Sequence, residues 1–507
     1  MDIFNSLALG FKVALSPMNL FYCFIGSVLG TAVGVLPGLG CAATIALLLP
    51  LTFYLNDVGA LIMLAGIYYG AMYGGSTTSI LFRIPGESTS VVTCLDGYAM
   101  AKNGRAGAAL GISAFGSFIA GTLAIIGLTF FAPGVAEWAL EFGPPEYFSL
   151  MVLGMTLVTF LGRGSAVKTI MMAILGMLLG TVGLDPVNSV ARFTFGSTFL
   201  MSGLELVLLA MGMFGIVEVL KMIERPVQQE QVVKAPKDFL SLLPNLQEWK
   251  DSSFPILRGT VLGFLVGVLP GGGAIISTFA SYGIEKRISK HPERFGEGAI
   301  EGVAGPESAN NAASTGAFIP LLTLGIPSNG AIALLLGAIM IHGITPGPLL
   351  FKNRPDMFWG LVASMYIGNV MLIVLNLPLV GLFAKIAYLP TSIINPIIAF
   401  ICILGAYGVN NNSMDILIMI FFGVLGYFLE KLDFEPAPLL LAFILGPMIE
   451  IALRQSLILS RGTGFAIFFS RPISAITLSV AIILYFSPLV TKIIKGHVTR
   501  RRGRITF

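Results

Sequence analysis

Long apolar runs alternate with short polar segments along almost the whole chain, from Leu20 to Val490. Many runs reach about 20 residues, the length that a helix needs to cross the roughly 30 Å hydrocarbon core of a bilayer. They lie near 18–36, 40–55, 58–82, 106–132, 146–161, 166–184, 203–222, 256–280, 308–325, 329–346, 358–384, 391–409, 414–429, 436–453 and 472–490. The pattern predicts an all-α polytopic membrane protein with about 10–14 membrane segments, some of them half-spans or re-entrant hairpins.

The longest polar interruption, at 224–253, separates the apolar runs into two groups. It contains prolines and charges of both signs, which is typical of a connector in water. We therefore expect a first transmembrane half at 1–223, a polar connector at 224–255 and a second transmembrane half at 256–507. The chain ends in a basic tail with Arg500, Arg501, Arg502 and Arg504, which the positive-inside rule places in the cytoplasm.

The basic loops also predict how one apolar run crosses the membrane. The loops at 83–105, 163–168 and 221–250 are separated by two spans each, so they share one side, assigned to the cytoplasm. The basic loop 286–294 belongs to the same side, although only the run 256–280 separates it from the connector. We therefore predict that this run enters the membrane and returns, turning at Pro270 and Gly271.

Composition excludes several classes of protein. Hydrophobic residues make up 55% of the 507 residues and charged residues 11%, against about 25% charged in a soluble domain. The formal net charge of +4 is small and most concentrated in the tail, so nucleic-acid binding is not expected. The four cysteines and three histidines are scattered, so neither a disulfide framework nor a metal site is indicated.

A repeated motif relates the two halves. Residues 26–40 (GSVLGTAVGVLPGLG) and 259–273 (GTVLGFLVGVLPGGG) share 11 identities in 15 positions at an offset of 233. A weaker correspondence aligns 75–87 with 317–329 on their Ile-Pro pairs, so each half carries two breaks. Duplicated halves with broken helices are typical of secondary transporters, and we expect the halves to be inverted repeats.

The glycines of the repeat have two interpretations. Their spacing of four residues lets helices pack closely, which needs no function. Packing does not account for Pro37-Gly38 and Pro270-Gly271, where residues that break helices stand inside apolar runs and free backbone N–H and C=O groups. Both interpretations stay open, and the second makes the breaks candidate binding sites.

Polar residues cluster around the breaks. A helix N-terminus offers N–H groups to an anion, while unwound carbonyls and Ser, Thr or Asn oxygens suit a cation such as Na⁺. The candidate substrate and ion residues are Gly34, Pro37, Gly38, Gly40, Ser76, Thr77, Thr78, Pro85, Gly86, Glu87, Ser88, Pro270, Gly271, Gly272, Gly273, Glu307, Ser308, Asn310, Asn311, Thr315, Pro327, Ser328 and Asn329. The alternative is that the polar side chains bond to neighbouring helices, and that Glu87 and Glu307 are interfacial carboxylates.

Several motifs carry a family resemblance: the two Gly-Val-Leu-Pro-Gly segments, YGAMYGGSTTS at 69–79, IPGE at 84–87, DGY at 96–98 and HGITPGP at 342–348. With them, nearly the whole chain resembles the large membrane subunit of tripartite tricarboxylate transporters. The resemblance implies a permease in the bacterial cytoplasmic (inner) membrane that works with a small membrane subunit and a periplasmic solute-binding protein. It also implies import of citrate or another organic carboxylate, driven by Na⁺ or H⁺ and without a cofactor.

Other functions remain as alternatives. A passive anion channel could use the same breaks as a filter. A membrane-embedded enzyme is less expected, because the sequence shows no nucleophile with a base and no metal-ligand set, and a Walker-type phosphate loop is also missing. Whether the chain forms a homodimer stays open.

Overall fold

The computed structural model describes residues 3–36, 38–161, 165–185, 187–224, 233, 238–271 and 273–485. Within these ranges the chain is almost entirely helical. Eight of the described helices are long and apolar enough to cross a membrane, or nine if one pair bent by 100° counts as a span. Four shorter apolar helices of 10–17 residues bring the candidate segments into the predicted range. The prediction of an all-α polytopic membrane protein is confirmed.

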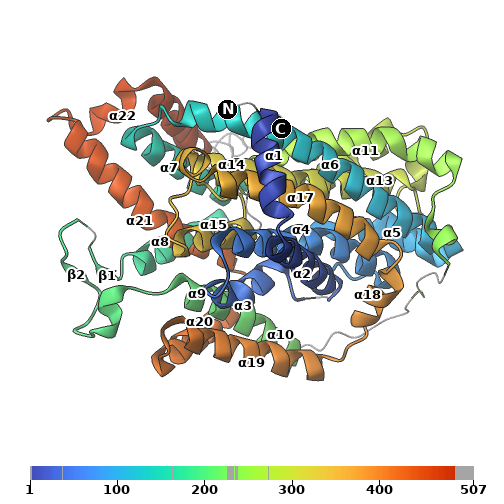
Figure 1. The fold of residues 1–507 in the computed structure, drawn as a ribbon, viewed down its shortest axis with the longest axis horizontal. Helices are drawn as coiled ribbons and strands as arrows, with labels where there is room; N and C mark the ends of the chain where they lie inside the picture. The colour runs from blue at the N-terminus through green and yellow to red at the C-terminus, as the bar shows by residue number, and fades with distance from the viewer. Residues whose placement is uncertain are drawn as a thin grey trace, which may run out of the picture.

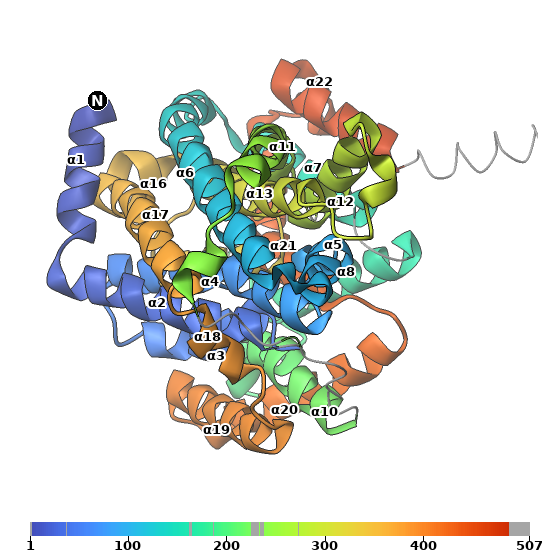
Figure 2. The ribbon, with the colours of Figure 1, turned by 90° about the vertical axis from the view of Figure 1, so that its right-hand side faces the viewer.

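The first half contains α1 (Ile3–Ala14), α2 (Pro17–Val35), α3 (Cys41–Thr52), α4 (Asp57–Phe82), α5 (Thr93–Met100), α6 (Ala106–Ala139), α7 (Pro144–Leu161), α8 (Ala166–Gly180), β1 (Gly183–Leu184), β2 (Ala191–Arg192), α9 (Leu206–Ala210) and α10 (Val217–Glu224). The second contains α11 (Leu246–Gly267), α12 (Gly273–Ile288), α13 (Glu301–Gly316), α14 (Phe318–Leu324), α15 (Gly330–Ile341), α16 (Pro348–Asn353), α17 (Pro355–Asn376), α18 (Val380–Ile386), α19 (Thr391–Asn410), α20 (Ser413–Lys431), α21 (Pro436–Leu459), α22 (Ile467–Ser470) and a last helix, Pro472–Tyr485. Helices from both halves interleave: α17 lies beside α2 and α4, and α13 lies beside α6 (Figures 1 and 2).

The helices follow the predicted apolar runs with four main differences. The run 358–384 is divided into α17 and α18 at 377–379, where Pro378 has no N–H to continue the helix. Residues 3–14 form a separate helix, α1, which packs so closely on α17 that a Cβ added at Gly10 would lie 2.2 Å from the carbonyl oxygen of Trp359. The run 308–325 is split into α13 and α14, where Pro320 has no N–H to continue the ladder. Helix α11 begins inside the predicted connector, because Asn245 accepts a hydrogen bond from the Glu248 N–H at 2.9 Å. Residues 225–232 and 234–237 of that connector lie outside the described residues.

Helices α2 and α4 run in the same direction with their backbones in contact. A Cβ added at Gly26 would lie 2.3 Å from the carbonyl oxygen of Met63, and one at Gly34 would lie 2.4 Å from that of Ala71. These glycines therefore have no room for a side chain, and the close-packing interpretation of their spacing holds. Because α2 and α4 are parallel, the chain must travel back between them, and α3 lies in that stretch.

The second half repeats this packing with α11 and α13. A Cβ added at Gly259 would lie 2.3 Å from the carbonyl oxygen of Gly305, and one at Gly267 the same distance from that of Ala313. The glycines keep the offset of 233 from the first half, whereas their partners keep the offset of 242 that aligns the two Ile-Pro pairs. Both sequence correspondences thus fall on equivalent packing contacts. Whether the halves are inverted relative to the membrane stays a prediction.

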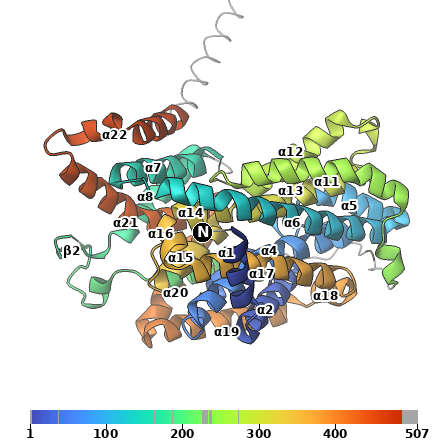
Figure 3. The ribbon, with the colours of Figure 1, turned by 45° about the horizontal axis from the view of Figure 1, so that its top comes forward.

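Helices α11 and α12 form the predicted hairpin. α11 ends at Gly267 and α12 begins at Gly273, so the turn falls at the Pro270–Gly271 break. Far from this turn, Arg258 of α11 forms an ion pair with Glu285 of α12, with Nη2 and Oε2 2.5 Å apart. This ion pair joins the start of α11 to the end of α12, so the two helices run antiparallel, side by side. Figure 3 shows α12 beside α11 and α13.

A small β-hairpin, β1 with β2, protrudes from the helical body (Figures 1 and 3). Asp185 fixes its turn by accepting a hydrogen bond from the Val187 N–H at 2.8 Å. Its carboxylate also contacts Arg192 and accepts from Arg454 at 3.1 Å, which ties the hairpin to α21. The Val187 N–H and these guanidinium groups hold the pKa of Asp185 well below its usual range.

Asp96, from the DGY motif, ties the two halves together. The side chain is buried in α5, and its Oδ1 accepts hydrogen bonds from the N–H groups of Gly296, Gly298 and Ala299 at 2.8 to 2.9 Å. Its Oδ2 accepts from the Tyr282 hydroxyl at 2.9 Å. The segment between α12 and α13 is thus fastened to the first half.

Candidate functional site

A cavity of about 570 Å³ lies between the two halves. Its wall contains Gly40 and Cys41, which follow the first glycine break, and Gly271 and Ala274 at the second. Four helices begin at this wall: α3, α12, α15 and α21. The volume falls in the range of about 300–1,000 Å³ found for small-molecule sites. The structure therefore gathers both breaks around one space of suitable size.

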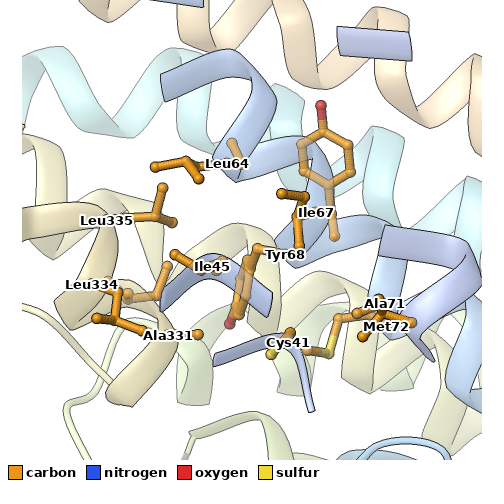
Figure 4. Packing of buried hydrophobic residues seen from close by; sticks show 14 of the residues in the cluster. Cys41, Ile45, Leu64, Ile67, Tyr68, Ala71, Met72, Ala331, Leu334 and Leu335 are labelled. Carbon is orange, nitrogen blue, oxygen red and sulfur yellow. The ribbon is translucent and has the colours of Figure 1, made fainter. Parts of the chain in front are cut away.

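Buried apolar side chains pack behind the wall. Figure 4 shows Tyr68 among aliphatic residues of α3, α4 and α15, with its hydroxyl between Cys41 and Ala331 in this view. The hydroxyl accepts a hydrogen bond from the Asn329 side-chain amide at 3.0 Å. This contact links α4 of the first half to the start of α15 in the second, so both halves hold the wall in place.

The first break sets a glutamate against the start of α3. Gly38 has φ of +91°, a conformation that residues with a Cβ rarely adopt. Beyond it, the Cys41 N–H donates a hydrogen bond to Oε1 of Glu87 at 2.5 Å. Helix N-termini carry partial positive charge, so a carboxylate is stabilised there. The Glu87 carboxylate thus occupies the anion position at the start of α3.

The second break brings the start of α12 next to Ser328. Gly271 has φ of +105°, and its N–H donates a hydrogen bond to the Ser328 carbonyl oxygen at 2.9 Å. A Cβ added at Gly273 would lie 2.5 Å from the carbonyl oxygen of Val266, so α12 begins against the end of α11. The turn can therefore bring α12 to the cavity only with glycine at these two positions.

The four helix starts differ in how many of their N–H groups are already used. Glu87 accepts from α3, and Oδ1 of Asn329 accepts from the Ile332 N–H at 3.0 Å in α15. α21 begins with Pro436 and Pro438, which have no N–H. For α12, the preceding residue, Gly272, lies outside the described residues, and no described side chain accepts a hydrogen bond from the N–H groups of Gly273 and Ala274. These N–H groups are therefore the candidate donors to an anion in the cavity.

Ser328 adds a second binding group at the same place. Its side chain is 1% exposed and lines the cavity, and its Oγ has no hydrogen-bond partner among the described residues. A buried hydroxyl without a partner costs free energy that a bonded ligand restores. The hydroxyl and the N–H groups of α12 together suit a carboxylate.

One lysine and three glutamates line the cavity in the described part of the chain: Lys221, Glu87, Glu430 and Glu435. The ammonium nitrogen of Lys221 lies 2.8 Å from Oε1 of Glu218 and 3.0 Å from Oε2 of Glu430. Lys221, Glu430 and Glu435 are not among the residues predicted from the sequence. The Glu435-Pro436 pair is typical of a helix start and is the one local signal that pointed here.

A second group of candidate residues lies between α4, α5, α6 and α13 and does not line this cavity. Glu307 is buried there, and its carboxylate accepts hydrogen bonds from the hydroxyls of Ser76, at 2.5 Å, and Thr93. The side-chain amide of Asn311 donates to Ser117 at 2.7 Å. Both atoms of the Asn310 amide are buried without a partner among the described residues. Glu307 is thus buried within the protein and enclosed by polar groups, and its depth in the membrane stays a prediction.

Of the remaining polar candidates, some lie at the cavity and others lie between the helices around Glu307. Ser88 lines the cavity. Ser308 donates to the Gly116 carbonyl at 3.3 Å and Thr78 to the Gly75 carbonyl at 3.2 Å, which are the interhelical and intrahelical bonds of the alternative interpretation. Thr77 and Thr315 are buried, and Thr315 borders a narrow gap beside α6 and α17.

The backbone candidates shape the turns. A Cβ added at Gly86 would lie 1.8 Å from the carbonyl oxygen of Gly34, so the Ile-Pro segment of the first half touches the end of α2. Pro85 and Pro327 stand in the non-helical stretches that follow α4 and α14, and Pro270 stands in the turn of the hairpin. Pro37 and Gly272 lie outside the described residues.

Two equivalent broken segments around an internal cavity are typical of helical membrane transporters. The chain belongs to the tripartite tricarboxylate transporter TctA family, whose model matches residues 20–441. The predicted family is confirmed. Since this family comprises large subunits of tripartite systems, the chain is a multi-pass subunit that works with partner subunits.

Two proteins of Agrobacterium vitis are similar to the chain. One, described as an uncharacterized 52.8 kDa protein in the TAR-I ttuC' 3' region, is 50% identical over 482 residues, which cover 95% of each chain. The other, described as an uncharacterized protein in the TAR-II ttuC' 3' region, is 50% identical over 231 residues, 46% of this chain and 95% of its own. No solved structure gives a significant match.

Proposed function

We propose that the chain imports a small organic carboxylate, a tricarboxylate or a related acid, across the bacterial inner membrane. The observation that carries the proposal is that α12 begins beside the Ser328 hydroxyl, which has no hydrogen-bond partner among the described residues, in a cavity shared by both halves. Backbone N–H groups at a helix start together with a hydroxyl form a typical carboxylate site. We also propose that the basic C-terminal tail lies in the cytoplasm, as the positive-inside rule favours.

The charge of the cavity supports coupling to a cation. With three glutamates and one lysine in its described wall, the cavity carries an excess of acidic groups. An anion that enters such a space is repelled unless a cation accompanies it. We therefore propose symport with Na⁺ or H⁺, in which the ion gradient drives uptake without a cofactor.

The second polar group is the proposed place for part of that ion coupling. Glu307 and Asn310 are buried, and they provide a carboxylate and an amide with no cationic partner within the described residues. Such oxygens are ligands for a hard cation, and a buried carboxylate can alternatively carry a proton. Partner subunits would complete the system, namely a small membrane subunit and a periplasmic binding protein that delivers the substrate.

The test is uptake of radiolabelled citrate and other carboxylates by vesicles that contain the chain, its small membrane partner and its binding protein. Accumulation against the gradient should require both the binding protein and an inward Na⁺ or H⁺ gradient. Downhill flux that needs neither would make the chain a passive anion channel, and no carboxylate flux at all would remove the proposed substrate class.

A further inference from the structure

The cavity wall contains one basic side chain in the described part of the chain, Lys221 at the end of α10. A carboxylate bound at the start of α12 uses backbone N–H groups and Ser328, so it leaves Lys221 unused. For a substrate with a single carboxylate, the N–H groups of α12 and the Ser328 hydroxyl would be sufficient. Lys221 is therefore available to recognise a further group of the substrate.

Lys221 forms ion pairs with two acids. Glu218 precedes it by one turn of α10, and Glu430 reaches it from the end of α20. The Lys221–Glu430 contact crosses from the first half of the chain to the second. Beside it, Lys431 of α20 pairs with Glu224 of α10 at 2.9 Å, but neither of these two residues lines the cavity.

The ion pair at the cavity is easily exchanged. The side chains of Lys221, Glu430 and Glu218 are 43%, 25% and 17% exposed, so water and ions reach the contact. Ion pairs this accessible contribute little net stability, because water solvates the separated charges nearly as well. The single positive charge of Lys221 also faces two negative charges. If Glu430 moves away from the ammonium group, Glu218 still pairs with it.

We propose that Lys221 binds a second carboxylate of the substrate, which takes the place of Glu430 on the ammonium group. The inference rests on the proposed function and narrows it to acids with at least two carboxylates. One carboxylate binds at the start of α12 and Ser328, and the other binds at Lys221. Binding then also releases one of the ion pairs between α10 and α20, while the Lys431–Glu224 pair stays in place.

The test is direct binding to the full chain in lipid nanodiscs, because a binding protein would impose its own selectivity on uptake. The probes are L-malate and L-lactate, 2-hydroxy acids that differ by one carboxylate. The measured quantity is the ratio of the lactate Kd to the malate Kd. Lys221→Met should lower this ratio about tenfold, as expected for a lost hydrogen bond to a charged group, whereas Lys221→Arg should retain most of it.

Two further variants separate recognition from structure. Glu430→Gln removes the competing carboxylate, so malate should bind about two- to fivefold more tightly, within the range of an exposed ion pair. Lys431→Met breaks the neighbouring contact between the same helices and should leave the ratio unchanged.

An unchanged ratio in Lys221→Met, or weaker malate binding in Glu430→Gln, would overturn the inference and leave the proposed function standing. If the wild-type chain binds neither malate, lactate nor citrate, the proposed function fails and the inference fails with it.

Discussion

Replacing Ser328 with alanine should weaken substrate binding without lowering the stability of the folded protein. The Ser328 hydroxyl is buried and has no hydrogen-bond partner among the described residues. Its removal therefore breaks no described hydrogen bond and relieves the desolvation of an unpaired polar group. With a carboxylate bound, the same change removes a donor to a charged acceptor. Binding and stability should thus respond in different directions.

The sizes of both effects follow from the type of bond. A hydrogen bond to a charged group contributes about 1.5–3 kcal/mol, which corresponds to a rise in the citrate Kd of about tenfold to somewhat over a hundredfold. The unfolding temperature of the empty variant should be equal to that of the wild type or higher. Both are measured on the full chain in nanodiscs, by equilibrium binding of citrate and by thermal unfolding.

Ser281→Ala is the matched control. Ser281 lies on α12, is 2% exposed and also has an unpartnered hydroxyl, but it does not line the cavity. Its replacement should change stability in the same way and leave the citrate Kd unchanged. The reasoning is refuted if Ser328→Ala binds citrate as the wild type does, or if both variants lose affinity alike.

Further predictions concern the hairpin, the ion site and pH. Gly273→Ala places a Cβ 2.5 Å from a backbone oxygen and should destabilise the chain by about 1–3 kcal/mol, whereas Gly283→Ala, with nothing within 4 Å, should be neutral or stabilising in thermal unfolding. Asn310→Ala should raise the ion concentration for half-maximal uptake severalfold; an unchanged ion dependence excludes it as a ligand. Because the folded-state pKa of Asp185 is depressed, its contribution to stability is complete above about pH 5 and is lost progressively as the pH falls further. Protection from hydrogen exchange, relative to the intrinsic rate at each pH, should therefore be lost in the β-hairpin first; equal loss of protection throughout the chain would contradict this.

The sequence predicts the breaks and the hairpin well, because both follow from local chemistry. Pro270 and Gly271 cannot continue a helix in an apolar run, and the chain turns there. The glycines at intervals of four fix which face of α2 meets α4, since only that face has no side chains. Repetition of the motif then indicates that the second half packs in the same way.

The charged part of the cavity could not be predicted in this way. Lys221 and Glu430 stand 209 positions apart at the ends of two apolar runs, and each reads locally as a helix-end charge. Their contact depends on how α10 and α20 pack, which no periodicity encodes. Glu307 is similar, because its hydroxyl partner Ser76 comes from the other half. The division of the candidates into a cavity group and an enclosed group is likewise a result of tertiary packing.

A cryo-electron microscopy map of the full chain with bound citrate shows most directly where the substrate binds. We expect density for the anion in the 570 Å³ cavity, in contact with the start of α12 and the Ser328 hydroxyl. Density elsewhere, for example in the separate cavity of about 360 Å³ that Leu36, Ile84 and Tyr388 line, would contradict it.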